Sequence, residues 1–220
     1  MMKKPVILLL VMFMLLMPMA CAKETQPAPS PLPPPPPASS PSYPNHGITT
    51  TKAEPKPGDN IFRSSSLPWD LTTDDLIEES DAVVIGKVVD ILPARQVGIG
   101  VSRRHWIITT DVIIEIERYL YGQPQSPHIA VMVQGGRVEQ TFVRVEDQPE
   151  FNLGEKVALF LKRHQQEIAP PEGFEDAEYY MVTGSFLGKF GYKDGNMVNL
   201  EGDSFTVAEF EQKIASIRGR

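Results

Sequence analysis

Two β-branched segments, residues 82–92 and 105–120, constrain the fold of this chain more than any other feature. The first begins as a continuous apolar run, which predicts a strand covered on both faces, and Gly86 within it predicts a bulge or bend. The second alternates apolar and polar side chains, as at Ile114 and Glu115, which predicts a strand with one face in the core. The segments that follow predict further strands arranged around this pair.

Shorter apolar segments bounded by turn residues predict the remaining strands. They are residues 129–133, 137–145, 156–162, 179–183, 186–192 and 197–200. The Asp194-Gly195 pair between the last two segments is a strong hairpin signal. Residues 95–104 and 165–177 are predicted to be loops.

Two segments carry helix-capping signals. Thr72 or Thr73, followed by acidic residues, predicts a short helix before the first strand. Thr206 and Glu209 have the spacing of a capping box, and an apolar stripe after them predicts a C-terminal helix. No helix pattern separates the strands, which argues against a Rossmann-type sheet. The predicted fold class is therefore mainly β: a small antiparallel OB-like barrel with a short N-terminal helix and a C-terminal helix.

The first 20 residues have the pattern of a secretory signal peptide. Lys3 and Lys4 precede an apolar run over residues 6–17, which is too short to span ~30 Å of hydrocarbon comfortably. The residues before Cys21 resemble a bacterial lipobox, although Pro18 and Met19 depart from its usual pattern. We therefore expect lipidation at Cys21 and a membrane-anchored protein on the extracytoplasmic face. Plain secretion after ordinary cleavage and an uncleaved anchor are the alternatives.

A proline-rich tether is predicted between the leader and the barrel. Residues 21–58 are dominated by Pro, Ser, Thr and Ala, so they offer too little apolar surface to offset the entropy of an ordered chain. At ~3.1 Å per residue, a polyproline II conformation gives a reach on the order of 100 Å. The predicted organisation is thus a signal peptide (1–20), a disordered tether (21–58) and an OB-like domain (59–220).

The charge and the cysteine content argue against a nucleic-acid partner and against an internal disulfide. The net charge is −7, and the residues after the leader contain no long run of Lys or Arg, so a nucleic-acid partner is not expected. Cys21 is the only cysteine, so the domain has no internal disulfide.

Several segments resemble a group of bacterial extracytoplasmic proteins of unassigned function. The segments are residues 75–77, 80–88 (SDAVVIGKV), 112–122, 135–136, 151–161 (FNLGEKVALFL) and 180–190. More loosely, the opening strand resembles that of netrin-like domains and tissue inhibitors of metalloproteinases, which implies an OB-like barrel. Those inhibitors are pinned by disulfides and bind the protease metal through a free N-terminal cysteine. This domain has no cysteine and Cys21 lies beyond the tether, so the inhibitory mechanism does not carry over to any residue.

A search for catalytic and metal-binding patterns gives no assignment. The four histidines, His46, His105, His128 and His164, are not at ligand spacing, and no G-x-S-x-G elbow is present. The acidic residues of segment 167–178 lack a calcium-loop pattern. We therefore expect no catalytic, cofactor-binding or metal-binding residues and no cofactor.

The function expected from the sequence is binding without catalysis. A barrel on a proline-rich stalk suits a lipoprotein that binds another envelope protein or a wall component. Loops on a rigid barrel commonly carry binding residues, so residues 95–104 and 165–177 are the expected contact regions. The alternatives are a protease inhibitor of the netrin-like type, by fold analogy, and a hydrolase with an unrecognised site.

Overall fold

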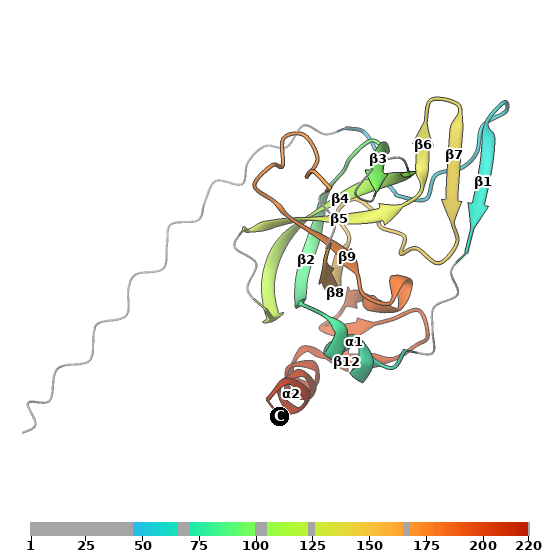
Figure 1. The fold of residues 1–220 in the computed structure, drawn as a ribbon. Coiled ribbons are helices and arrows are strands. Elements are labelled where there is room, and N and C mark those ends of the chain that lie inside the picture. Colours follow the sequence, from blue (N-terminus) through green and yellow to red (C-terminus); the bar gives the residue numbers. More distant parts are fainter. Residues whose placement is uncertain (1–45, 66–70, 100–104, 123–125, 165–167, 220) are drawn as a thin grey trace, which may run out of the picture. The chain divides into compact units, whose positions relative to one another are not determined.

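The computed structural model describes residues 46–65, 71–99, 105–122, 126–164 and 168–219 (Figure 1). All of them belong to the second of the two compact units into which the chain divides, residues 42–220. The expected signal peptide, Cys21 and the tether as far as residue 45 lie outside the described residues. No helix among the described residues is long and apolar enough to cross a membrane.

Five strands form a closed ring. They are β2 (Ala82–Ile91), β4 (His105–Tyr121), β5 (His128–Gln134), β8 (Lys156–Arg163) and β9 (Glu178–Val182). Around the ring the order is β8-β2-β4-β5-β9, and β9 pairs back to β8. Every pair is antiparallel except β5 with β9, which is parallel. The predicted OB-like barrel is confirmed.

Further strands extend the ring and form a second sheet. The additional strands are β3 (Arg95–Ile99), β10 (Lys189–Lys193), β11 (Asn196–Val198), β12 (Ser204–Thr206), β1 (Asn60–Ser64), β6 (Gly136–Val138) and β7 (Thr141–Val145). Strand β3 pairs with β4, and β10, β11 and β12 continue outward from β8. Strands β1, β7 and β6 make a separate sheet, with β1 parallel to β7 (Figure 1).

Both predicted helices begin at the expected caps. Helix α1 (Thr73–Glu79) is capped by Thr72, whose hydroxyl accepts a hydrogen bond from the Asp75 amide. Helix α2 (Val207–Arg218) is capped in the same way by Thr206 and Glu209. In each helix the third residue's carboxylate also accepts from the cap residue's amide, which completes a capping box.

The core has three parts. The barrel interior is filled by residues from all five ring strands, such as Val84, Val112 and Tyr180. A second cluster, in which Phe160 packs edge-on against Phe210, lies between β8, β10 and the two helices. A third cluster covers the outer face of β4 and β5 with residues from β3 and from segment 168–177. Strand β2 is therefore covered on both faces, as the apolar run in its sequence predicts.

Gly86 confirms the predicted irregularity in β2. The register against β4 shifts between Ile85 and Gly86. A Cβ on Gly86 would lie 2.6 Å from the carbonyl oxygen of Glu115, so only glycine fits this approach.

Three local predictions were wrong. Residues 137–145 are not one strand, because Glu139 adopts a left-handed conformation (φ 52°) and turns the chain between β6 and β7. Part of the predicted loop 95–104 is strand β3, which gains its hydrogen bonds from the long β4. The start of segment 186–192 is a 3-10 turn, η1 (Ser185–Gly188), and the strand begins at Lys189.

Residues 46–58, which the sequence analysis assigns to the tether, contact the barrel. The amide of Thr51 donates to the Phe151 carbonyl at 2.9 Å, and the Leu153 amide donates to the Thr49 carbonyl at 2.9 Å. His46 Nδ1 lies 3.0 Å from the buried carboxylate of Asp90. These contacts join the described end of the predicted tether to the domain.

Candidate functional site

The described parts of the two expected contact regions, residues 95–99 and 168–177, meet over one face of the barrel. Arg95 on β3 donates from Nε to Asp111 at 2.6 Å and from a terminal nitrogen to the Ala169 carbonyl at 2.9 Å. The hydroxyl of Tyr179 also donates to Asp111, whose side chain is fully buried. Burial and the neighbouring Asp111 raise the pKa of the Tyr179 hydroxyl far above its ordinary range. The described parts of the two loops are thus joined by a partly buried, charged hydrogen-bond network.

Apolar residues of segment 168–177 complete this cover. Ile168, Phe174 and Ala177 are buried and pack in one cluster with Ala130 and Met132 of β5. OB-folds use this face of their second and third strands to bind oligomers. In the described chain the same face is occupied by the protein's own segment, so the expected contact loops form a cover over it.

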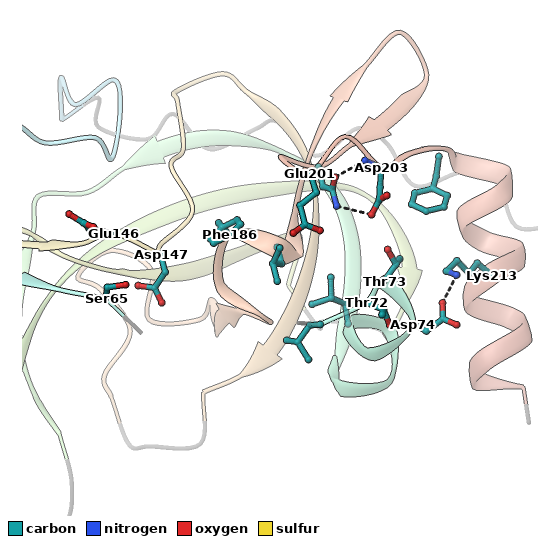
Figure 2. A pocket seen from close by; sticks show the side chains of 15 residues that line it. Ser65, Thr72, Thr73, Asp74, Glu146, Asp147, Phe186, Glu201, Asp203 and Lys213 are labelled. Atoms are coloured by element: carbon teal, nitrogen blue, oxygen red, sulfur yellow. Dashed lines mark hydrogen bonds and ion pairs between the residues drawn. The ribbon is translucent and has the colours of Figure 1, made fainter. Parts of the chain in front are cut away.

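An open cleft lies elsewhere, beside α1, η1 and α2. Its volume is about 840 Å³, within the range of ligand-binding pockets. Figure 2 shows Phe186 between two groups of acidic side chains, Glu146 with Asp147 and Glu201 with Asp203. The residues that line the cleft are Ser65, Leu71, Thr72, Thr73, Asp74, Leu76, Glu146, Asp147, Phe186, Leu187, Asn199, Glu201, Asp203, Phe205 and Lys213.

A second cavity of about 500 Å³ adjoins the first. The two share Glu146, Phe186 and Asn199 in their linings. We call them together the acidic groove. The second cavity is lined by Glu146, Gln148, Pro149, Glu150, Asn152, Glu155, Phe186, Lys189, Gly191, Val198, Asn199 and Leu200.

The charge of the acidic groove is strongly unbalanced. Seven carboxylates line it, those of Asp74, Glu146, Asp147, Glu150, Glu155, Glu201 and Asp203. Three of them are paired with lysines: Asp74 with Lys213, Glu155 with Lys189 at 2.6 Å, and Glu150 with Lys52 at 3.3 Å. Glu146 and Glu201 are exposed, and no ion pair holds either within the described chain. The groove therefore presents a negative potential to solvent.

Apolar side chains give the groove a second kind of surface. Leu71, Leu76 and Phe205 belong to the cluster under the helices and also line the larger cavity. Leu200 lines the smaller cavity and is 80% exposed, the most exposed large apolar side chain of the described residues. The turn that carries it is held by Asn199 and Asp203, whose amide donates to the Asn199 side chain at 2.8 Å. A positively charged segment with an apolar side chain matches both surfaces.

The histidines and the acidic loop do not converge on one site. His46 contacts Asp90, His164 packs near the ring of Tyr179, and the side chain of His105 lies outside the described residues. Burial lowers the pKa of His128. The Glu175 carboxylate accepts from the Gly173 amide within its own loop. Across the described residues no group of three or more His, Cys, Asp or Glu is arranged to hold a metal ion.

Comparison with known proteins leaves the chain unassigned. Neither the models of known protein families nor the curated proteins give a match. The expected lipidation site, Cys21, lies outside the described residues. The acidic groove was not found from the sequence, because its carboxylates come from five separate segments, among which the acidic turn around Glu201 and Asp203 is a weak local signal.

Proposed function

We propose that this chain is a membrane-tethered, non-catalytic binding module of the extracytoplasmic side that holds a basic segment of another envelope protein. The observation that carries the proposal is the acidic groove, which is lined by seven carboxylates, of which Glu146 and Glu201 are exposed and form no ion pair with a described residue. Complementary charge raises the rate of association and selects the partner, and it does so without any reaction. A cationic wall component would use the same groove.

The exposed apolar side chain supports a protein partner. Leu200 stands at the rim of the groove, and an apolar contact surrounded by charge is the common arrangement of protein interfaces. Complementary charge acts mainly on the rate and choice of association, whereas a buried apolar anchor adds residence time. We therefore expect the partner segment to place an apolar residue against Leu200 between lysines or arginines.

The N-terminal sequence supports the tethered location. The leader, Cys21 and the proline-rich residues after it have the order expected for a lipid anchor followed by a spacer. Lipidation at Cys21 would keep the groove within reach of one membrane surface. The two alternative functions, protease inhibitor and hydrolase, gain no supporting contact among the described residues.

The test is crosslinking and pull-down from intact cells with the full-length chain. The double variant Glu146→Gln/Glu201→Gln removes two exposed charges from the groove. The double variant Glu78→Gln/Glu172→Gln removes two exposed charges outside it and is the matched control. We expect the pull-down to capture an envelope protein with the parent chain and with the control, and to lose it with the groove variant. Cys21→Ala should weaken capture by releasing the chain from the membrane.

Purified full-length chain then tests the charge requirement directly. A labelled lysine–leucine peptide, KLKKLK, is titrated at low and high salt. At ~0.5 kcal/mol for each exposed charge, the groove variant should bind about fivefold more weakly. Equal binding by the groove variant and the control, or binding that does not weaken with salt, would place the partner elsewhere.

A further inference from the structure

Strand β1 is an open sheet edge. Among the described strands it pairs with β7 alone, and all five of its residues are exposed. Ile61 is 48% and Phe62 57% exposed, on opposite faces of the strand. Natural edge strands are usually guarded by proline, charged side chains, a bulge or a covering segment. The sequence of β1, NIFRS, has no proline, its pairing with β7 runs without a register shift, and its one charged side chain is Arg63.

The hydrogen bonds between β1 and β7 show which backbone groups of β1 point away from β7. The Asn60 amide donates to the Gln140 carbonyl at 2.7 Å, and the Ser64 carbonyl accepts from the Glu146 amide at 3.1 Å. In a parallel ladder, alternate residues direct their amide and carbonyl to the same neighbour. Asn60, Phe62 and Ser64 therefore face β7. Ile61 and Arg63 direct their amide and carbonyl groups to the open side.

One face of this sheet carries an unbalanced positive charge. Arg63 lies directly opposite Arg144 on β7. Like charges directly opposite each other on neighbouring strands destabilise a sheet. Arg137, on the same face, is paired with Asp59, whereas no carboxylate of the described chain forms an ion pair with Arg63 or Arg144. The chain as a whole has a net charge of −7, so these two neighbouring arginines are a local excess of positive charge.

We propose that β1 is a strand-addition site for an extended segment of a partner protein in which carboxylate and apolar side chains alternate. The added strand would bond to the open amide and carbonyl groups of Ile61 and Arg63. Its carboxylates would lie on the face of Arg63 and Arg144, and its apolar side chains would lie on the face of Phe62. This surface has the opposite charge to the acidic groove, whose lining begins at Ser65, the residue after β1.

The same features argue against two other occupants. In an antiparallel pair of two β1 strands centred on Phe62, four arginines from the two copies would share one interface, with no carboxylate between them. The chain's own tether sequence is rich in proline, which lacks the amide that strand pairing requires. An acidic, extended segment of another protein satisfies both the backbone and the charge.

The proposal is tested with a labelled peptide, TVEVEVT, titrated against the full-length chain. Two N-methylated forms are compared, one blocking the amides of the glutamates and one those of the valines. Because an added strand uses only one of its edges, one form should lose binding and the other should keep it. A lysine version, TVKVKVT, should not bind. If both N-methylated forms bind as well as the parent, or if the parent does not bind at about 1 mM, the proposal is overturned.

Variants of β1 locate the site. Ile61→Pro removes an amide that faces the open side and keeps those that face β7, while Arg63→Glu leaves the backbone unchanged and reverses the charge. Both should weaken binding at least about tenfold, and the matched charge reversal Lys87→Glu, on an exposed residue of β2, should not. Unchanged binding to Arg63→Glu would refute the proposal. A dimer of the parent chain that Ile61→Pro dissociates would instead identify a second copy as the occupant.

Discussion

Replacing Arg95 by methionine tests whether a buried charge network closes the outer face of β4 and β5. Methionine keeps an apolar stem at this position and removes the guanidinium that contacts Asp111 and the Ala169 carbonyl. The Asp111 side chain is fully buried and that of Arg95 is 30% exposed. Removing one partner of a buried ion pair costs about 3–5 kcal/mol. Because the Tyr179 hydroxyl still donates to Asp111, we expect the low end, about 3 kcal/mol.

The assay is urea unfolding of the purified chain, with thermal unfolding as a second measurement. The free energy of unfolding should fall by about 3 kcal/mol with an unchanged dependence on urea, since the surface exposed on unfolding is the same. For a domain of this size the melting temperature should fall by about 6–12 °C. The double variant Arg95→Met/Asp111→Asn removes both charges and should recover roughly half of the loss.

Two results would refute this reasoning. A loss below about 1 kcal/mol for Arg95→Met would show that solvent already satisfies Asp111 without the guanidinium. A double variant less stable than Arg95→Met would show that the Asp111 carboxylate stabilises the fold independently of Arg95. Hydrogen exchange adds a local readout: amides of segment 168–177 should lose protection before those of the barrel.

Three further changes test other parts of the structure. Gly86→Ala should cost about 2 kcal/mol because its Cβ would press on the β4 backbone, whereas Gly191→Ala, with 3.7 Å to its nearest neighbour, should be near neutral by urea unfolding. Burial lowers the pKa of His128, so just below about pH 6.5 the unfolded chain binds a proton at this residue that the folded chain does not. The free energy of unfolding should therefore fall as the pH drops below about 6.5, and His128→Asn should flatten this loss. Burial, with a hydrogen bond to Glu178, raises the pKa of Tyr180 to about 12, so stability should fall from about pH 10 to 12, less steeply in Tyr180→Phe. A pH profile unchanged by either substitution would contradict the corresponding assignment.

The ring strands and both helix caps were predictable because their signals are local. Alternation around Ile114 and the Thr206–Glu209 spacing each encode an element within a few residues. A closed or nearly closed barrel was predicted, but not that β8 and β9 close it or that β5 and β9 are parallel, since such pairings depend on partners distant in sequence. Strand β1 was missed because its five residues, NIFRS, have no marked alternation and gain their order from β7.

The candidate sites were missed for a related reason. The acidic groove joins carboxylates from separated segments, and each of them alone has the ordinary explanation of a solvated surface residue. The unmatched Arg63 and Arg144 become neighbours only through a parallel register between strands 77 residues or more apart in sequence, a feature that no sequence period encodes. In contrast, residues 165–177 could be recognised as a loop, but not as a partner of residues 95–99, which form β3.

The cover over β4 and β5 changes where a ligand of this barrel can bind. In other OB-folds that face is the binding platform. Here its exposure would require Ile168, Phe174 and Ala177 to leave an apolar cluster and would separate Arg95 from buried Asp111. Fully exposing each large apolar side chain costs about 1.5–3 kcal/mol, and breaking the ion pair adds about 3 kcal/mol. That sum is a large part of the 5–15 kcal/mol that stabilises a typical domain. A partner therefore gains more by docking where polar and apolar groups are already open, at the groove and at the edge of β1.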